Sequence, residues 1–195
     1  HIYEQDLTKL GAAAELYQKI QKKELLISVL INNAGFGLVG STDTIDLQND
    51  EEMITINVIN LVSLCKLFIA DMYRHKQGKI LNVSSTGAFQ PGPYTSTYFA
   101  SKAFVLSYSR AIRYEAKSKG IHISTLCPGA TKTGFFRREG TKMPEHAMSP
   151  KTVARIAYKG LMKNKEIIVP GLHNRFLQLF PVKLKMIIVA KMKQS

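Results

Sequence analysis

The sequence predicts an α/β fold in which a doubly wound parallel sheet lies between two layers of helices. Three observations support this three-layer α/β/α arrangement. Short apolar runs alternate with longer helical patterns along the chain, as strands and helices do in such folds. The run Leu25 to Ile31 is almost entirely apolar, which is typical of a strand buried on both faces of a sheet. Small and polar residues directly follow several of these runs, and ligands bind at the carboxyl ends of parallel strands.

The composition is that of a globular protein with one sizeable core. The chain has 195 residues and a formal net charge of +13, but no nucleic-acid recognition motif accompanies this charge, so we do not expect nucleic-acid binding. Cys65 and Cys127 lie in apolar runs and form no close motif, which favours buried thiols in a reducing compartment over a disulfide. No apolar run is expected to span a bilayer, and no signal peptide is visible. We expect a cytoplasmic or membrane-peripheral protein.

The first half of the chain is predicted to contain the end of a strand at His1–Gln5, a helix from about Gly11 to Lys23, a strand at Leu25–Ile31 and a long helix from about Gln48 to Tyr73. The second strand ends in the run 32–37, whose small residues would let a ligand approach the backbone closely. Asn57 and Asn60 fall inside the long helix, which is unusual for asparagine. Either both side chains are solvated, or Asn57 marks a local distortion with a function.

The second half is predicted to contain a strand at Lys79–Val83, a loop at Pro91–Pro93, a helix from an N-cap at Thr97 to about Lys119, a strand at Ile121–Cys127, a helix from an N-cap at Ser149 to about Lys163, and a short strand at Glu166–Val169. Residues 130–149 form a long irregular segment at the end of a strand, which is a candidate lid. Its apolar side chains, Phe135, Phe136, Met143 and Met148, indicate an apolar pocket.

Tyr98 and Lys102 are four residues apart, so they lie on one face of the predicted helix. A phenol ordinarily titrates near pH ~10, and a neighbouring ammonium lowers its pKa toward a value useful for proton transfer. In a chain with eight tyrosines and many lysines such a pair also arises by chance, and a solvated helix face is the alternative. The pair gains weight because Asp6, Asn33, Ser85 and the Pro128-Gly129 pair follow predicted strands and therefore converge on the same edge of the sheet.

These residues resemble, in order and spacing, the motifs of the classical short-chain dehydrogenases/reductases. The matching segments are Asp6-Leu7, Asn32-Asn33-Ala34-Gly35, Asn57, Ser85, Tyr98-Phe99-Ala100-Ser101-Lys102 and Pro128-Gly129-Ala130-Thr131-Lys132-Thr133. The resemblance implies a Rossmann-like fold, with residues 1–171 forming a partial domain that holds the family's third to seventh strands. The family's first strand, Gly-rich turn and second strand have no counterpart here, so we interpret the chain as an N-terminally truncated piece of a longer protein.

The resemblance implies an NAD(P)(H)-dependent oxidoreductase that interconverts a carbonyl and a secondary alcohol on a small, apolar substrate. Tyr98 would transfer the proton, Lys102 would lower its pKa and bind the nicotinamide ribose, Ser85 would hydrogen-bond the substrate oxygen, and Asn57 would hold a water that links Lys102 to solvent. Ser84 would point to the opposite side. Asn33, Ala34 and Gly35 would lie against the adenosine half of the cofactor, and Asp6 and Leu7 would lie at the adenine. Pro128, Gly129, Thr131 and Thr133 would approach the nicotinamide amide and the phosphates.

The resemblance leaves several points open. NADP is preferred to NAD only on family grounds, because the segment that discriminates between them is not in the sequence. The complete protein is expected to be a homo-oligomer, and no metal-binding residues are assigned. A non-catalytic binding or regulatory module, in which cofactor binding is lost, is the alternative to an enzyme.

Residues 172–195 form a basic, amphipathic C-terminal extension, in which apolar residues mix with lysines. The extension would be an ordinary packed helix, a helix that lies on an anionic membrane surface, or a cover over the pocket or over a second subunit.

Overall fold

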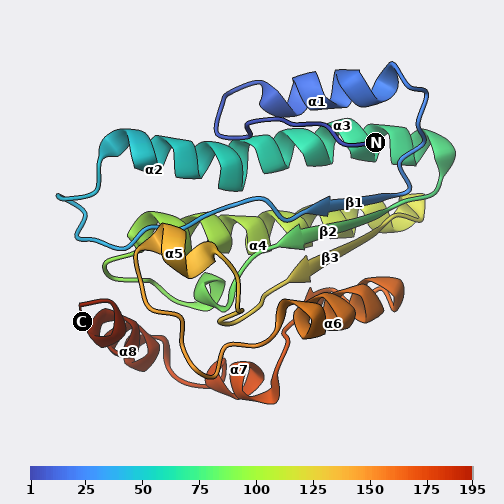
Figure 1. The fold of residues 1–195 in the computed structure, drawn as a ribbon. Helices are drawn as coiled ribbons and strands as arrows, with labels where there is room; N and C mark the ends of the chain where they lie inside the picture. The colour runs from blue at the N-terminus through green and yellow to red at the C-terminus, as the bar shows by residue number, and fades with distance from the viewer. Residues whose placement is uncertain (195) are drawn as a thin grey trace.

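The computed structural model describes residues 1–194 and places a four-stranded parallel sheet between layers of helices (Figure 1). The strands follow one another in chain order: β1 (Val29–Asn32), β2 (Lys79–Val83), β3 (His122–Leu126) and β4 (Ile167–Ile168). Ile80 of β2 lies opposite Leu30 of β1 and Ile123 of β3. Because parallel neighbours cannot be joined by a tight turn, a helical crossover connects each pair of strands. The predicted doubly wound α/β fold is confirmed.

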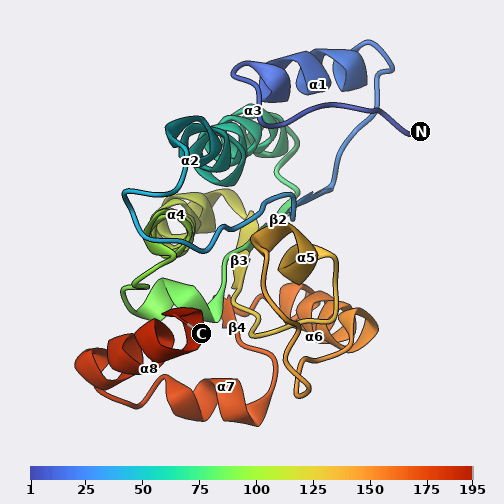
Figure 2. The same ribbon diagram turned by 60° about the vertical axis from the view of Figure 1, so that its left-hand side comes forward.

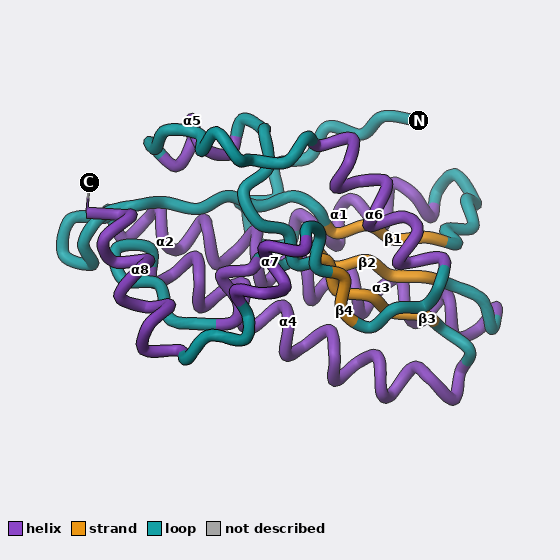
Figure 3. Tube along the Cα trace, turned by 90° about the horizontal axis from the view of Figure 1, so that it is seen from below, coloured by secondary structure: helices purple, strands orange, loops and turns teal. Residues whose placement is uncertain are grey.

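The helices are α1 (Ala12–Gln21), α2 (Leu47–Ile54), α3 (Asn60–His75), α4 (Ser96–Ala116), α5 (Phe135–Glu139), α6 (Pro150–Met162), α7 (Leu172–Leu177) and α8 (Val182–Gln194), with a π-helical turn at Thr55–Ile59 between α2 and α3. Helices α3 and α4 cover one face of the sheet, α6 covers the other, and α1 packs on the outside of α3 (Figures 1 and 2). Beyond the carboxyl ends of the strands lie α5 and α8 (Figures 1 and 3). This edge therefore carries both the lid and the C-terminal extension.

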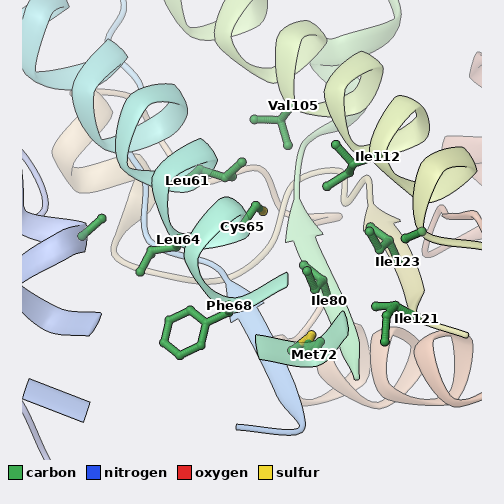
Figure 4. Close-up of a cluster of buried hydrophobic side chains, with 12 residues drawn as sticks. Leu61, Leu64, Cys65, Phe68, Met72, Ile80, Val105, Ile112, Ile121 and Ile123 are labelled. Carbon is green, nitrogen blue, oxygen red and sulfur yellow. The ribbon is translucent and has the colours of Figure 1, made fainter. Parts of the chain in front are cut away.

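Two clusters of buried side chains hold the helices to the sheet. Successive residues of a strand point to opposite faces, so Ile80 faces α3 and α4 while Leu81 faces α6. On the first face the central strands contribute Ile80 and Ile123, and the helices contribute Leu61, Leu64, Cys65, Phe68, Met72, Val105 and Ile112 (Figure 4). On the second face Leu81, Leu126 and Ile168 meet Val153, Ala157 and Leu161 of α6. Both cysteines are free and buried, as expected.

The predicted strand at His1–Gln5 is wrong. A strand needs a neighbour for its hydrogen bonds, and these residues instead run along α1. The Gln5 side chain donates to Glu15 at 2.9 Å and accepts from Lys19 at 2.7 Å. The strand expected at Leu25–Ile31 is also shorter, because pairing with β2 begins only at Val29. It is not buried on both faces, since β1 lies at the edge of the sheet and leaves Val29 and Ile31 exposed. The helix predicted to end near Lys163 begins as expected, with the Ser149 hydroxyl accepting from the Thr152 backbone N–H at its N-terminus.

The continuous helical stretch Leu47–His75 is long and apolar enough to cross a membrane by length and composition, which was not expected from the sequence. Within the fold, 44% of its most apolar window is buried. Its apolar side chains, including Leu61, Cys65 and Phe68, pack on the sheet and on α1. A core helix of a globular domain explains these contacts, and the length of the helix alone is weak evidence for a membrane span.

Candidate active site

A cavity of about 1160 Å³ opens at the carboxyl edge of the sheet. The residues that line it come from the ends of β1, β2 and β3, from α4, from the lid and from α8; those predicted from the sequence are Asn33, Gly35, Ser85, Tyr98, Lys102, Pro128, Gly129, Thr131 and Thr133. Leu7 and Ala34 instead line a smaller, neighbouring cavity of about 220 Å³, which Asn33 also borders. Asp6 is absent from the lining of both cavities. Its carboxylate accepts hydrogen bonds from the hydroxyl and the backbone N–H of Thr8, and these bonds lower its pKa.

Tyr98 and Lys102 lie one turn apart at the start of α4, with Lys102 Nζ 5.7 Å from the centroid of the Tyr98 ring. Lys102 is buried, and its ammonium donates to the Val83 carbonyl at 3.1 Å. The helix begins at Ser96, one residue before the predicted N-cap Thr97. The predicted proximity of the phenol and the ammonium is therefore confirmed.

The predicted lowering of the Tyr98 pKa by Lys102 is wrong in this structure. Burial raises the pKa of Tyr98 to about 12; a hydrogen bond with Ser85 opposes this rise, and the charge of Glu139 adds to it. Burial also lowers the pKa of Lys102 to about 8. Desolvation penalises the charged form of each group and is the main cause of both shifts, with Lys102 buried and Tyr98 partly buried at the wall of the cavity.

Both Ser84 and Ser85 border the cavity, but their hydroxyls make different contacts. Ser85 caps the short 3₁₀ turn Thr86–Phe89, where its Oγ accepts from the Gly87 backbone N–H at 3.0 Å, and it lines the cavity. The Ser84 hydroxyl is buried and donates to the Lys102 carbonyl at 2.7 Å. The Ser84 hydroxyl thus ties the end of β2 to α4, whereas Ser85 shares a hydrogen bond with Tyr98.

Asn57 lies in the π-helical turn and is completely buried, so the solvated interpretation is wrong and the predicted distortion is confirmed. Its amide nitrogen donates to the Phe36 carbonyl at 2.9 Å and to the Ser101 hydroxyl at 3.1 Å, and its oxygen accepts from the Phe36 backbone N–H at 3.2 Å. A Cβ atom on Gly35 would lie only 2.5 Å from this oxygen and 3.3 Å from Lys102 Nζ. Asn57 therefore fixes the loop after β1 against α4, and Gly35 is needed for that approach.

Asn60 is also buried, and its role was missed at the level of sequence. Its amide nitrogen donates to the carbonyls of Leu7 and Lys9, both at 2.8 Å, and its oxygen accepts from the Ala13 backbone N–H at 3.1 Å. Asn60 thereby holds the loop that carries Asp6 and Leu7. An asparagine in a helix interior was the available signal, but its partners are far away in the sequence.

The loop after β3 supplies the threonine side of the cavity. The Thr131 hydroxyl donates to the Gly129 carbonyl at 3.0 Å, and the Thr133 hydroxyl accepts from the Phe135 backbone N–H at 3.3 Å. The lid then turns into α5, and the Phe135 ring lies 5.3 Å from the Tyr98 ring. Phe135 of the lid therefore packs on the Tyr98 ring, and Phe136 also lines the cavity. The prediction that Met143 and Met148 line the pocket is wrong, because Met143 is exposed and Met148 packs against the cluster under α6.

The C-terminal helix α8 forms a further wall of the cavity, which includes Lys185, Val189 and Lys193. Lys193 Nζ donates to Glu139 of the lid at 2.8 Å, and the two side chains are only 16% and 3% exposed. Lys185 Nζ donates to the Phe89 carbonyl at 3.3 Å. The ion pair was not predicted, because it joins residues whose separation no sequence pattern signals. Among the open interpretations of the extension, α8 is thus placed over the pocket.

The family of the chain follows from a match over most of its length. The model of the short chain dehydrogenase family matches residues 1–144. The chain belongs to the short-chain dehydrogenase family. The phenol, ammonium and serine found in the cavity lie within the matched range.

Relatives of this short-chain dehydrogenase include a ketoacyl reductase, HetN, from a Nostoc species, which is 31% identical over 84% of this chain and 58% of its own length. A 3-ketodihydrosphingosine reductase from Bacteroides thetaiotaomicron is 33% identical over 67% of this chain and 48% of its own length. The chain thus spans about half the length of the curated relatives it matches. The solved structure of a short-chain dehydrogenase from Sphingobium yanoikuyae in complex with NADPH is 27% identical, with a TM-score of 0.81 over 94% of this chain and 73% of that chain.

Proposed function

We propose that the protein is an NAD(P)(H)-dependent oxidoreductase that interconverts a carbonyl and a secondary alcohol on a small, largely apolar substrate. The observation that carries the proposal is the convergence of Ser85, Tyr98 and Lys102 on one cavity at the carboxyl edge of a parallel sheet. The names of two relatives, a ketoacyl reductase and a 3-ketodihydrosphingosine reductase, support a keto group as the reacting centre. The aromatic lid residues Phe135 and Phe136 support an apolar substrate.

The residues around the cavity fit a nicotinamide cofactor. Gly35 leaves the backbone bare beside Lys102, whose ammonium has three donors and uses one of them on the Val83 carbonyl. We propose that Lys102 holds the nicotinamide ribose, that Asn33 and Gly35 lie along the adenosine half, and that Thr131 and Thr133 approach the nicotinamide amide and the phosphates. The cofactor would supply or accept the hydride. NADP is preferred, because the similar Sphingobium structure contains NADPH.

Two further assignments rest on the resemblance. Asp6 and Leu7 are proposed to meet the adenine, since Asn60 holds their loop and Leu7 lines the smaller cavity together with Asn33 and Ala34, which follow β1. Asn57 is proposed to bind a water that links Lys102 to solvent. Both side-chain amide protons of Asn57 are already donated. Such a water would therefore have to donate to the side-chain oxygen or to the backbone carbonyl of Asn57.

For carbonyl reduction we propose that Tyr98 donates the proton and that Ser85 stabilises the charge that develops on the substrate oxygen. Because burial raises the pKa of Tyr98 to about 12, the phenol is protonated at neutral pH, as a proton donor must be. Phe135 packs against the Tyr98 ring, and this contact helps to exclude water from the reacting group.

The test is Tyr98→Phe in the full-length protein, assayed by loss of NADPH absorbance with a panel of 3-ketoacyl thioesters and long-chain ketones. Loss of the proton donor should lower kcat by roughly 10²- to 10⁴-fold. NADPH binding by Tyr98→Phe, measured by fluorescence titration, should remain nearly unchanged. Lys102→Ala should lower both kcat and NADPH affinity. Tyr158→Phe, on the exposed face of α6, is the matched control. If Tyr98→Phe keeps most of its turnover, the assignment of the proton donor is wrong.

We also propose that the complete protein is a cytoplasmic homo-oligomer. Ile54, Ile59 and Phe104 on the long helices are each about two-fifths exposed, and we propose them as part of the subunit contact. Sedimentation velocity of the full-length protein, with Phe104→Ser as the variant, tests the oligomer. Fractionation of cells that express the protein tests its location.

A further inference from the structure

Helix α8 has two faces with different surroundings. Its inward face carries Lys185 and Lys193, which make hydrogen bonds inside the cavity. Its outward face carries Leu184 and Ile187, which are 42% and 52% exposed and lie outside the cavity lining. One helix therefore both walls the catalytic cavity and presents apolar side chains to the surroundings.

The exposed apolar surface continues along the chain into α7. Phe176 and Phe180 pack edge to face at 5.5 Å, yet Phe176 remains 60% exposed and the neighbouring Leu179 remains 79% exposed. We call the whole set the tail face; it consists of the exposed side chains Leu172, Phe176, Leu179, Phe180, Val182, Leu184, Ile187, Ile188 and Met192. Exposed apolar side chains gathered on two successive helices in this way mark a candidate interaction site rather than ordinary surface.

The charges around the tail face select its partner. Exposed basic side chains at Arg175, Lys183 and Lys191 stand beside the apolar ones, and residues 167–195 contain no aspartate or glutamate. A second copy of the chain, meeting this face with the same face about a twofold axis, would bring these cations together. Anionic lipid headgroups would instead neutralise them while the apolar side chains enter the interfacial region. The charge pattern therefore favours a membrane surface over a second subunit.

We propose that α7 and α8 dock the protein on an anionic membrane surface, with α8 lying in the plane of the interface. Because α8 also walls the cavity, docking would bring the substrate entrance next to lipid. This second step rests on the proposed oxidoreductase function and explains how an apolar carbonyl compound would reach Tyr98 without crossing water. Ile188 and Met192 support the connection, since both are exposed at the tail face and line the cavity.

The test is co-sedimentation of the full-length protein with vesicles of phosphatidylcholine alone or mixed with phosphatidylserine. We expect binding to the anionic vesicles only, and loss of binding at high salt. Reversing two charges with K183E/K191E should weaken binding by roughly thirtyfold or more. Leu184→Ser together with Ile187→Ser should weaken it by roughly tenfold. The matched control K151E/K159E reverses the same number of charges on the exposed face of α6 and should bind nearly as well as the wild type.

Each other outcome overturns the docking proposal. These outcomes are absence of binding at low salt, equal binding to vesicles without anionic lipid, equal weakening by the α6 control, and a dimer that Ile187→Ser dissociates in sedimentation velocity while vesicles remain unbound. The catalytic proposal is tested separately, because turnover of a water-soluble ketone without vesicles should be the same in the wild type and in K183E/K191E. If the wild type has no turnover but still binds vesicles, the catalytic proposal fails alone.

Discussion

Replacing the buried Lys102 with methionine should stabilise the cofactor-free protein at neutral pH while abolishing its activity. Burial lowers the pKa of Lys102 from its ordinary value of 10.5 to about 8. At neutral pH the ammonium is therefore held in the fold against its preference for water. A methionine has a similar shape and carries no charge, so it removes that penalty.

The magnitude follows from the change in proton affinity. At 1.36 kcal/mol per pKa unit, holding the ammonium in the fold at pH 7 costs about 3 kcal/mol relative to the unfolded chain. The variant leaves the Val83 carbonyl without its donor, which costs about 1 kcal/mol. We therefore expect Lys102→Met to raise the free energy of unfolding at pH 7 by about 2 kcal/mol.

The sign of the effect also predicts its pH dependence. Between about pH 8 and 10.5 the unfolded chain holds the Lys102 proton and the folded chain has released it. Wild-type stability should therefore rise with pH across this window, and Lys102→Met should lack that rise, so that the two proteins converge near pH 10. Urea unfolding at pH 7 and pH 10 measures both differences. Lys117→Met, at an exposed site just after α4, is the control and should follow the wild type. A variant that is less stable than the wild type by the same amount at both pH values would refute the reasoning.

Two further predictions concern the walls of the cavity. Lys193→Met should leave the Glu139 carboxylate buried without its charge partner and lower the free energy of unfolding by about 3 kcal/mol. Adding Glu139→Gln to this variant should recover part of the loss. Urea unfolding of the single and double variants measures both effects, and additive losses would contradict the prediction. Gly35→Ala should lower NADPH affinity in a fluorescence titration, because its Cβ would press on Asn57 and Lys102. Gly134→Ala is the control, since the nearest atom to its Cβ would lie 3.6 Å away. Equal effects of the two variants would contradict the explanation by close approach.

The sequence was sufficient for the fold and for the position of the site. Local signals carried this success: the apolar run of β2, the Ser149-Pro150 start of α6 and the small residues after β1 all depend on near neighbours in the chain. The strand expected at His1–Gln5 failed because a strand is defined by its partner, and no local pattern reveals whether the partner is there. For the same reason the sequence located β4 but not its ends: a strand was expected at Glu166–Val169, and only Ile167 and Ile168 pair with β3.

The contacts that complete the site depend on residues far apart in the sequence. Asn60 holds a loop more than fifty residues earlier, and Lys193 joins Glu139 of the lid across 54 residues. An asparagine inside a helix signals that something is unusual, but it does not identify the partner. Only the crossing of α3 over the N-terminal loop, and of α8 over the lid, brings these groups together.

Tyr98 and Lys102 show why spacing predicts proximity better than chemistry. A helix places residues four apart on one face whatever surrounds them, so the pair was predictable from sequence. The direction in which each pKa moves depends on the environment, and here burial raises the pKa of Tyr98 and lowers that of Lys102. That burial keeps the phenol protonated, as a proton donor to a carbonyl must be, and it makes the lysine a source of instability. Stability and the proposed function therefore place opposite demands on the same side chain.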